Sequence, residues 1–139
     1  MTHMFDCFND IIRLQTGESL LETLEQFVQQ NELPGAWISG LGGASQVTLG
    51  FYDLDKKEYQ WQTFDGLREV VSLTGNIAFD ENGKPAFHLH GVFGDRQFQT
   101  VGGHVKDLVA GATLELFIHR TCKPLHRKPD EQTGLQLLA

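Results

Sequence analysis

Apolar and polar positions follow two different periods along this chain of 139 residues. Between residues 20 and 28 the apolar side chains recur at helical spacing, and they are Leu20, Leu21, Leu24, Phe27 and Val28. This spacing places them on one face of an amphipathic helix. Ser19 and Glu22 form the S-x-x-E capping box that begins such a helix. The Leu-Pro-Gly sequence at 33–35 breaks it, so the helix should end around Asn31.

The rest of the chain favours strands, because its apolar residues alternate with polar ones or form short runs. Strands are expected over residues 4–14, 36–41, 45–54, 58–64, 67–79, 86–93, 98–105 and 112–120. Segments 53–57 and 80–85 predict tight turns, and Asn82-Gly83 suits the positive φ of a hairpin. The pattern predicts an α+β fold in a single domain, residues 1–139. A mostly antiparallel sheet carries the early amphipathic helix packed on it.

The charge balance argues against binding to phosphate backbones. The net charge is −7 at pH 7 and the pI is about 5.2, whereas a protein that binds DNA through phosphates needs clustered Lys and Arg. One basic cluster lies near the C-terminus and contains Arg120, Lys123, Arg127 and Lys128. We interpret this cluster as a solvated tail, and DNA as a disfavoured partner.

Cysteine usage and hydropathy predict a cytoplasmic protein. Cys7 and Cys122 lie far apart and form no CxxC pair, so reduced thiols are expected and a single disulfide is the alternative. The N-terminal segment lacks the basic and apolar regions of a signal peptide. No apolar run approaches the roughly 20 residues of a membrane span, so no membrane partner is expected.

Three histidines in the segment HLHGVFGDRQFQTVGGHV, residues 88–105, give the strongest sign of chemistry. Residues i and i+2 of a strand point to the same face, so His88 and His90 should lie side by side. A turn at 94–96 would bring His104 next to them, and the two glycines before His104 allow close backbone approach. We interpret the three as a metal site. The alternative is a set of hydrogen-bonded strand residues without metal.

Three neutral imidazoles suit a divalent metal, zinc first, with nickel or iron as alternatives. Three protein ligands leave a fourth position open, which is typical of a catalytic site, and a water bound there would ionise near neutral pH. A metal-bound histidine usually donates its other N–H to a carboxylate or carbonyl. Glu69 and Glu115 are candidates because each lies among apolar strand residues; pairing with a basic side chain at a sheet edge is the alternative.

Other motifs predict structure rather than chemistry. SGLGGAS, residues 39–45, does not fit G-x-G-x-x-G and precedes a strand, so a kink or bulge is expected there. The aromatic residues in strand patterns are expected in the core or at an interface, and they are Trp37, Tyr52, Tyr59 and Trp61. His3, His119 and His126 lack neighbouring ligands and are expected at the surface or in the tail.

The order of several segments gives a family resemblance. The segments are IIRLQTGESLLETLEQF, AWISGLGGASQVTLGFYD, LREVVSLTGNIAFDENGKPAFHLHGVFGD, VGGHVKDLVAGATLELFI and TGLQLL. In this order they resemble a prokaryotic PPC domain, the domain shared with plant AT-hook nuclear proteins, over nearly the whole chain. The pair HLH and GGH is the most diagnostic feature. Gly91 and Val105 depart from the pattern, which tends to have Ala and Leu there.

The resemblance implies an α+β domain that assembles as a homotrimer, and such sequences often carry a DNA-binding label. The chain has no RGRP core and no basic arm, through which the plant relatives contact DNA. A more distant similarity, to acetolactate decarboxylases, implies that His88, His90 and His104 match a zinc-binding triad. The decarboxylase reaction does not follow from it, because fold does not fix function.

Three functions are therefore open. The first is a trimeric metal-binding protein, a lyase or hydrolase acting on a small-molecule substrate. The second is a DNA-associated protein, and the third is a protein–protein assembly module without catalysis. The sequence does not decide whether the metal site closes within one chain or between subunits.

Overall fold

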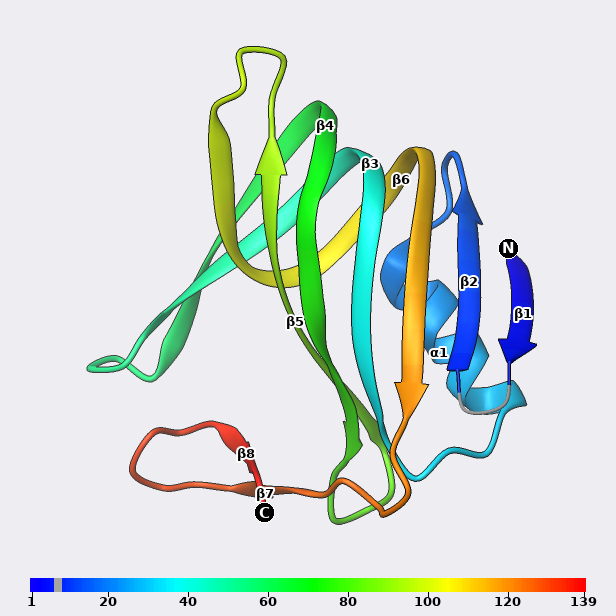
Figure 1. Ribbon diagram of the computed structural model, residues 1–139. Coiled ribbons are helices and arrows are strands. Elements are labelled where there is room, and N and C mark those ends of the chain that lie inside the picture. The colour runs from blue at the N-terminus through cyan, green and yellow to red at the C-terminus, as the bar shows by residue number, and fades with distance from the viewer. Residues whose placement is uncertain (7–8) are drawn as a thin grey trace.

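The computed structural model describes residues 1–6 and 9–139 (Figure 1). In chain order the elements are β1 (Thr2–Asp6), β2 (Asn9–Gln15), α1 (Leu20–Gln30), β3 (Ala36–Asp53), β4 (Glu58–Phe79), β5 (Pro85–Gly94), β6 (Thr100–Arg120), β7 (Arg127–Pro129) and β8 (Gln136–Leu138). Six strands form a sheet in the order β1-β2-β6-β3-β4-β5, β6 also pairs with β5, and β7 pairs with β8. All these pairings are antiparallel. The predicted combination of one early helix and a mostly antiparallel sheet is confirmed for the described residues.

Some strands are longer than the sequence predicts. Each of β3, β4 and β6 joins two predicted strands into one. In β3 the glycine-rich break is a bulged region, because the pairing register with β4 shifts between Gly40 and Gly42 and again between Ala44 and Gln46. A bulge bends a strand without ending its pairing. The expected bulge is therefore present, but it lies within one strand instead of between two.

The N-terminal strand predicted over residues 4–14 is instead two strands. β1 and β2 pair antiparallel, with Asp6 opposite Asn9. Apolar residues occur on both sides of this reversal, so the pattern alone gives no sign of it.

The prediction for Cys7 lies outside the described residues, whereas Cys122 is exposed and forms no disulfide.

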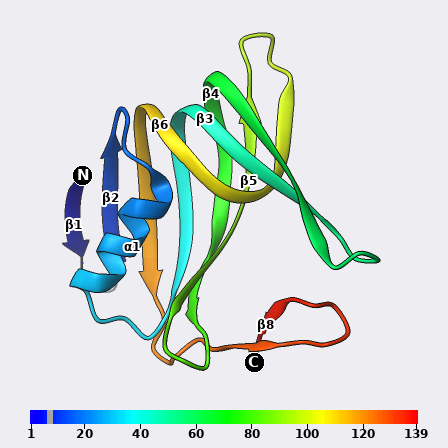
Figure 2. The same ribbon diagram turned by 180° about the vertical axis from the view of Figure 1, so that it is seen from behind.

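Helix α1 begins and ends where its sequence signals predict. Ser19 is the N-cap, its Oγ accepts the backbone N–H of Glu22 at 3.2 Å, and Asn31 is the C-cap. The side chains that α1 buries in the main hydrophobic cluster of the sheet include Leu20, Leu24 and Phe27. Figure 2 shows the helix beside β6 and β2. No helix in residues 1–6 and 9–139 is long and apolar enough to cross a membrane.

A buried ion pair fixes the C-terminal end of β6. Asp10 is fully buried, and Arg120 donates to its carboxylate from Nε at 2.7 Å and from Nη2 at 3.0 Å. His3 also contacts this carboxylate, with its Nε2 at 2.6 Å from Oδ1. Burial alone would raise the pKa of Asp10, but the bonds to Arg120 and His3 outweigh it and hold that pKa below its ordinary value. Arg120 is therefore part of the fold, and the prediction of a solvated tail is wrong for it.

Gly75 sets the approach of β4 to the strand that carries two of the histidines. It lies opposite Leu89, and a Cβ at Gly75 would overlap the His88 carbonyl oxygen and lie 2.8 Å from the Leu89 Cα. We predict that Gly75→Ala lowers the free energy of unfolding by about 1–3 kcal/mol, as overpacking does. Urea unfolding measures this change. Gly94→Ala is the control, because a Cβ there meets Val71 at an ordinary 3.5 Å; an unchanged midpoint in Gly75→Ala would contradict the prediction.

Candidate metal centre

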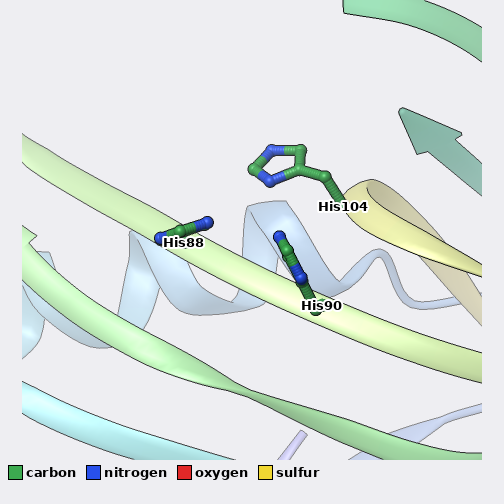
Figure 3. Close-up of side chains that lie close together, drawn as sticks. All are labelled: His88, His90 and His104. Atoms are coloured by element: carbon green, nitrogen blue, oxygen red, sulfur yellow. The ribbon is translucent and has the colours of Figure 1, made fainter. Parts of the chain in front are cut away.

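Strands β5 and β6 bring His88, His90 and His104 together. On β5 the two histidines alternate with buried Leu89, so their side chains point away from the core. His90 lies directly opposite His104 on β6. Directly opposed residues share a sheet face, so His104 joins the pair as the sequence predicts. Figure 3 shows the three side chains gathered around one point.

The ring nitrogens lie close to the spacing that a single metal ion requires. One nitrogen from each histidine lies within 4.8 Å of the other two. The ring centroids are 5.0 Å apart for His88 and His90, 5.4 Å for His88 and His104, and 5.6 Å for His90 and His104. Imidazole nitrogens bind zinc at about 2.0–2.1 Å and would lie roughly 3.3 Å apart around it. The cluster is thus slightly wider than a loaded tetrahedral site.

His104 carries an unsatisfied nitrogen inside this cluster. Its Nδ1 is buried and has no hydrogen-bond partner among the described residues. Buried polar atoms are normally hydrogen-bonded, so such an atom calls for a reason. A metal ligand offers a bare lone pair and needs no hydrogen bond at that nitrogen. The three histidines therefore fit a divalent metal.

Burial keeps two of the histidines neutral. It lowers the pKa of His104 to about 4, and the charges of His88, His90 and Arg127 add to the effect. The pKa of His88 is lowered as well, first by burial and then by Arg127 and His90. Only neutral imidazole binds a metal. Near neutral pH these two rings need lose no proton to become ligands.

The structure brings neither Glu69 nor Glu115 to the histidines. Glu69 lies opposite Gly94 at the far end of β5, and Glu115 lies opposite Leu41 on β3. Both side chains are exposed. Within the described part of the chain, no hydrogen bond or ion pair joins either carboxylate to the cluster. The apolar pattern places a residue on a face of a strand, but it does not give its distance from a site on another strand.

The residue that does contact the cluster is Arg127, which the sequence suggests is a solvated tail residue. Its Nη2 donates to the Asn76 Oδ1 at 2.8 Å and to the His88 Nδ1 at 3.3 Å, and its Nη1 donates to the Gln136 carbonyl at 2.7 Å. The side chain is buried, with 6% of the residue exposed. The C-terminal pair β7–β8 turns back below the sheet (Figure 1). Because Arg127 is the first residue of β7, this return brings its side chain to the histidine cluster. The tail prediction is wrong for Arg127; Leu135, Leu137 and Leu138 were the one sign of this return.

A cavity of about 330 Å³ lies beside the cluster. It is lined by Tyr59, Ala86, Phe87, His88, His104, Arg127 and residues 134–137. The loop of the C-terminal pair is held to the β3–β4 hairpin, because the Tyr52 hydroxyl donates to the Thr133 carbonyl at 2.7 Å. A cavity of this size accepts a small molecule.

Aromatic residues form one side of the centre. The ring centroids of Tyr52 and Tyr59 are 4.9 Å apart, and those of Tyr59 and Trp61 are 4.6 Å apart. The Tyr59 ring lies 4.8 Å from the His104 ring. Trp61 is 43% exposed and therefore lies outside the core, whereas its other expected place, an interface, stays a prediction. His119 and His126 are exposed, as expected.

Comparison with models of protein families assigns the chain to a family. The model of the Plants and Prokaryotes Conserved (PCC) domain matches residues 9–121. The chain belongs to this family. The resemblance to PPC domains is thereby confirmed. The three histidines lie inside the matched PCC segment, and Arg127 lies beyond it.

Solved structures agree with this assignment. A "putative DNA-binding protein" from Ralstonia eutropha JMP134 is 31% identical, with a TM-score of 0.90 over 99% of this chain and 94% of that one. A "metal-containing protein" from Archaeoglobus fulgidus is 28% identical, with a TM-score of 0.86 over 100% and 99% of the two chains. Acetolactate decarboxylase from Bacillus subtilis subspecies spizizenii is 16% identical, with a TM-score of 0.60 over 84% of this chain and 54% of that one, and this likeness shows the fold alone. No curated protein matches.

The lowered pKa of His104 makes the metal-free protein less stable in mild acid. An unfolded histidine takes up a proton near pH 6.5, whereas folded His104 does so only at about 4. Between these values the unfolded state binds more protons, so the free energy of unfolding falls as the pH drops from 6.5 towards 4. Urea unfolding of metal-free protein at several pH values measures this fall. The fall in the free energy of unfolding should be smaller in His104→Gln than in the wild type. Identical pH profiles for the two proteins would contradict the lowered pKa of His104.

Proposed function

We propose that this PCC-domain protein is a metal-dependent lyase or hydrolase in which His88, His90 and His104 hold one divalent ion. Zinc is the first choice, with nickel or iron as alternatives. The observation that carries the proposal is the convergence of three ring nitrogens within 4.8 Å, one ring having a buried nitrogen without a partner. The metal-containing relative from Archaeoglobus fulgidus supports it.

The residues around the cluster suit chemistry on a small molecule. A divalent ion held by three histidines supplies a Lewis acid with an open coordination position. The Tyr59 hydroxyl holds its proton at neutral pH, as a tyrosine ordinarily does, and burial, with a contribution from Tyr52, raises its pKa further. As a residue of the cavity wall it can donate a hydrogen bond to a bound molecule. The aromatic rings and the C-terminal pair line two sides of the site.

Elemental analysis tests the metal site. Untagged protein purified without nickel resin should contain close to one metal ion per chain. His88→Ala, His90→Ala and His104→Ala should each lose most of it, because two imidazoles seldom hold a divalent ion tightly. His126→Ala, which removes an exposed histidine outside the cluster, should keep it. Unchanged metal content in all three cluster variants would refute the proposal.

We also propose that the protein is a homotrimer assembled through an apolar face of the sheet. Trp37, Leu41 and Phe117 are 54%, 57% and 51% exposed. Trp37 is opposite Asn76, which is opposite His88, so this apolar face is continuous with the histidine face. Exposed apolar patches usually mark interfaces. The family resemblance favours a second and third copy of the chain as the partners.

Light scattering tests the assembly. Phe117→Glu places a charge in the apolar face and should convert a trimer to monomers, because a buried unpaired charge is costly. Gln26→Glu adds the same charge at an exposed position of α1 and should leave the trimer intact. A monomeric wild-type protein would exclude the trimer. A trimer without metal would favour the alternative, an assembly module without catalysis.

The basic cluster gives little support to DNA binding. Arg120 pairs with Asp10 and Arg127 is buried, which leaves Lys123 and Lys128 of the cluster at the surface. Phosphate contacts need exposed and clustered cations.

A cytoplasmic location is part of the present proposal, because the exposed Cys122 thiol fits a reducing compartment.

A further inference from the structure

Arg127 is a buried cation without a carboxylate partner. Among the ion pairs of the described residues, none includes Arg127. Its acceptors are the neutral groups of Asn76, Gln136 and His88, and its Nε is buried with no hydrogen-bond partner in the described part of the chain. Arg120, in contrast, is neutralised by Asp10 through two hydrogen bonds. A buried charge is costly unless an opposite charge compensates it. Arg127 lacks the carboxylate partner that compensates the charge of Arg120.

The contact with His88 cannot persist when His88 binds a metal. A guanidinium only donates hydrogen bonds, so the contact occupies the Nδ1 lone pair and leaves the proton of a neutral ring on Nε2. A metal on Nδ1 would take that lone pair. A metal on Nε2 would move the proton to Nδ1, and two donors would then face each other. In either case Arg127 loses an acceptor and has an N–H free for another one.

We propose that Arg127 binds the carboxylate of a small substrate with an apolar body, in the cavity beside the metal. This inference rests on the proposed metal site. The planar guanidinium matches a carboxylate and can donate two parallel hydrogen bonds to it. The remaining wall is largely apolar and includes Ala86, Phe87, Leu135 and Leu137. Among the described residues, no lysine and no second arginine line the cavity, which favours a carboxylate over a phosphate, an anion that usually needs several cations.

Calorimetric titration of the zinc-loaded protein with isovalerate tests the proposal. Isovaleramide, a neutral molecule of nearly the same shape, is the matched probe. Isovalerate should bind about tenfold or more tightly than the amide, because only the acid compensates the guanidinium. Arg127→Gln should remove this preference. Lys128→Gln, which removes an exposed charge at the next residue, should retain it.

Metal content separates the failure of this inference from failure of the metal site. Zinc should remain close to one ion per chain in Arg127→Gln. Equal binding of isovalerate by the zinc-loaded wild type and by zinc-loaded Arg127→Gln would overturn the role of Arg127 but not the metal site. Wild type that takes up no zinc would instead overturn the metal site on which the inference rests.

A second measurement covers the case in which Arg127→Gln does not fold. Isovalerate should raise the unfolding temperature of the zinc-loaded wild type more than isovaleramide does, because a ligand of the native state stabilises it. Equal effects of acid and amide would overturn the proposal. Tighter binding of inorganic phosphate than of isovalerate would overturn the carboxylate class.

Discussion

The pairing of β6 with three strands is the constraint on which the centre depends. β6 pairs with β2 and β3, and its first residues also pair with β5. Close approach there requires glycine: a Cβ at Gly102 would lie 3.0 Å from the Gly91 carbonyl oxygen, and one at Gly103 would lie 2.9 Å from the Gly50 carbonyl oxygen. With both positions free of side chains, β6 can lie between β5 and β3 and place His104 opposite His90.

Local features of the sequence predicted the parts of the centre that depend on one strand or one turn. The i, i+2 spacing of His88 and His90 fixes their common face in any strand, and the turn after Gly94 leaves little choice for the position of His104. The capping residue Ser19 likewise determines its helix end from its immediate neighbours.

The contact of Arg127 with His88 was not predictable in the same way. It joins residues that are far apart in the sequence, and it depends on how the C-terminal pair returns to the sheet. The leucines of residues 135–138 indicate a return, but neither periodicity nor spacing gives the position at which it places Arg127. The predicted ends of some strands were wrong for a related reason. A bulge, such as the one between Ala44 and Gln46, interrupts the alternation of apolar residues while the backbone pairing continues.

The boundary of the family match has a consequence for how substrate preference can change. The two strands that carry the histidines, β5 and β6, lie within residues 9–121, whereas Arg127 and residues 134–137 of the cavity wall lie beyond this range. The proposed metal ligands and Arg127, the proposed carboxylate-binding residue, are thus carried by separate segments of the chain. Under the proposed function, exchange of the C-terminal segment between relatives would alter which molecule enters the cavity while leaving the three histidines in place, so ligand preference could diversify independently of the proposed metal.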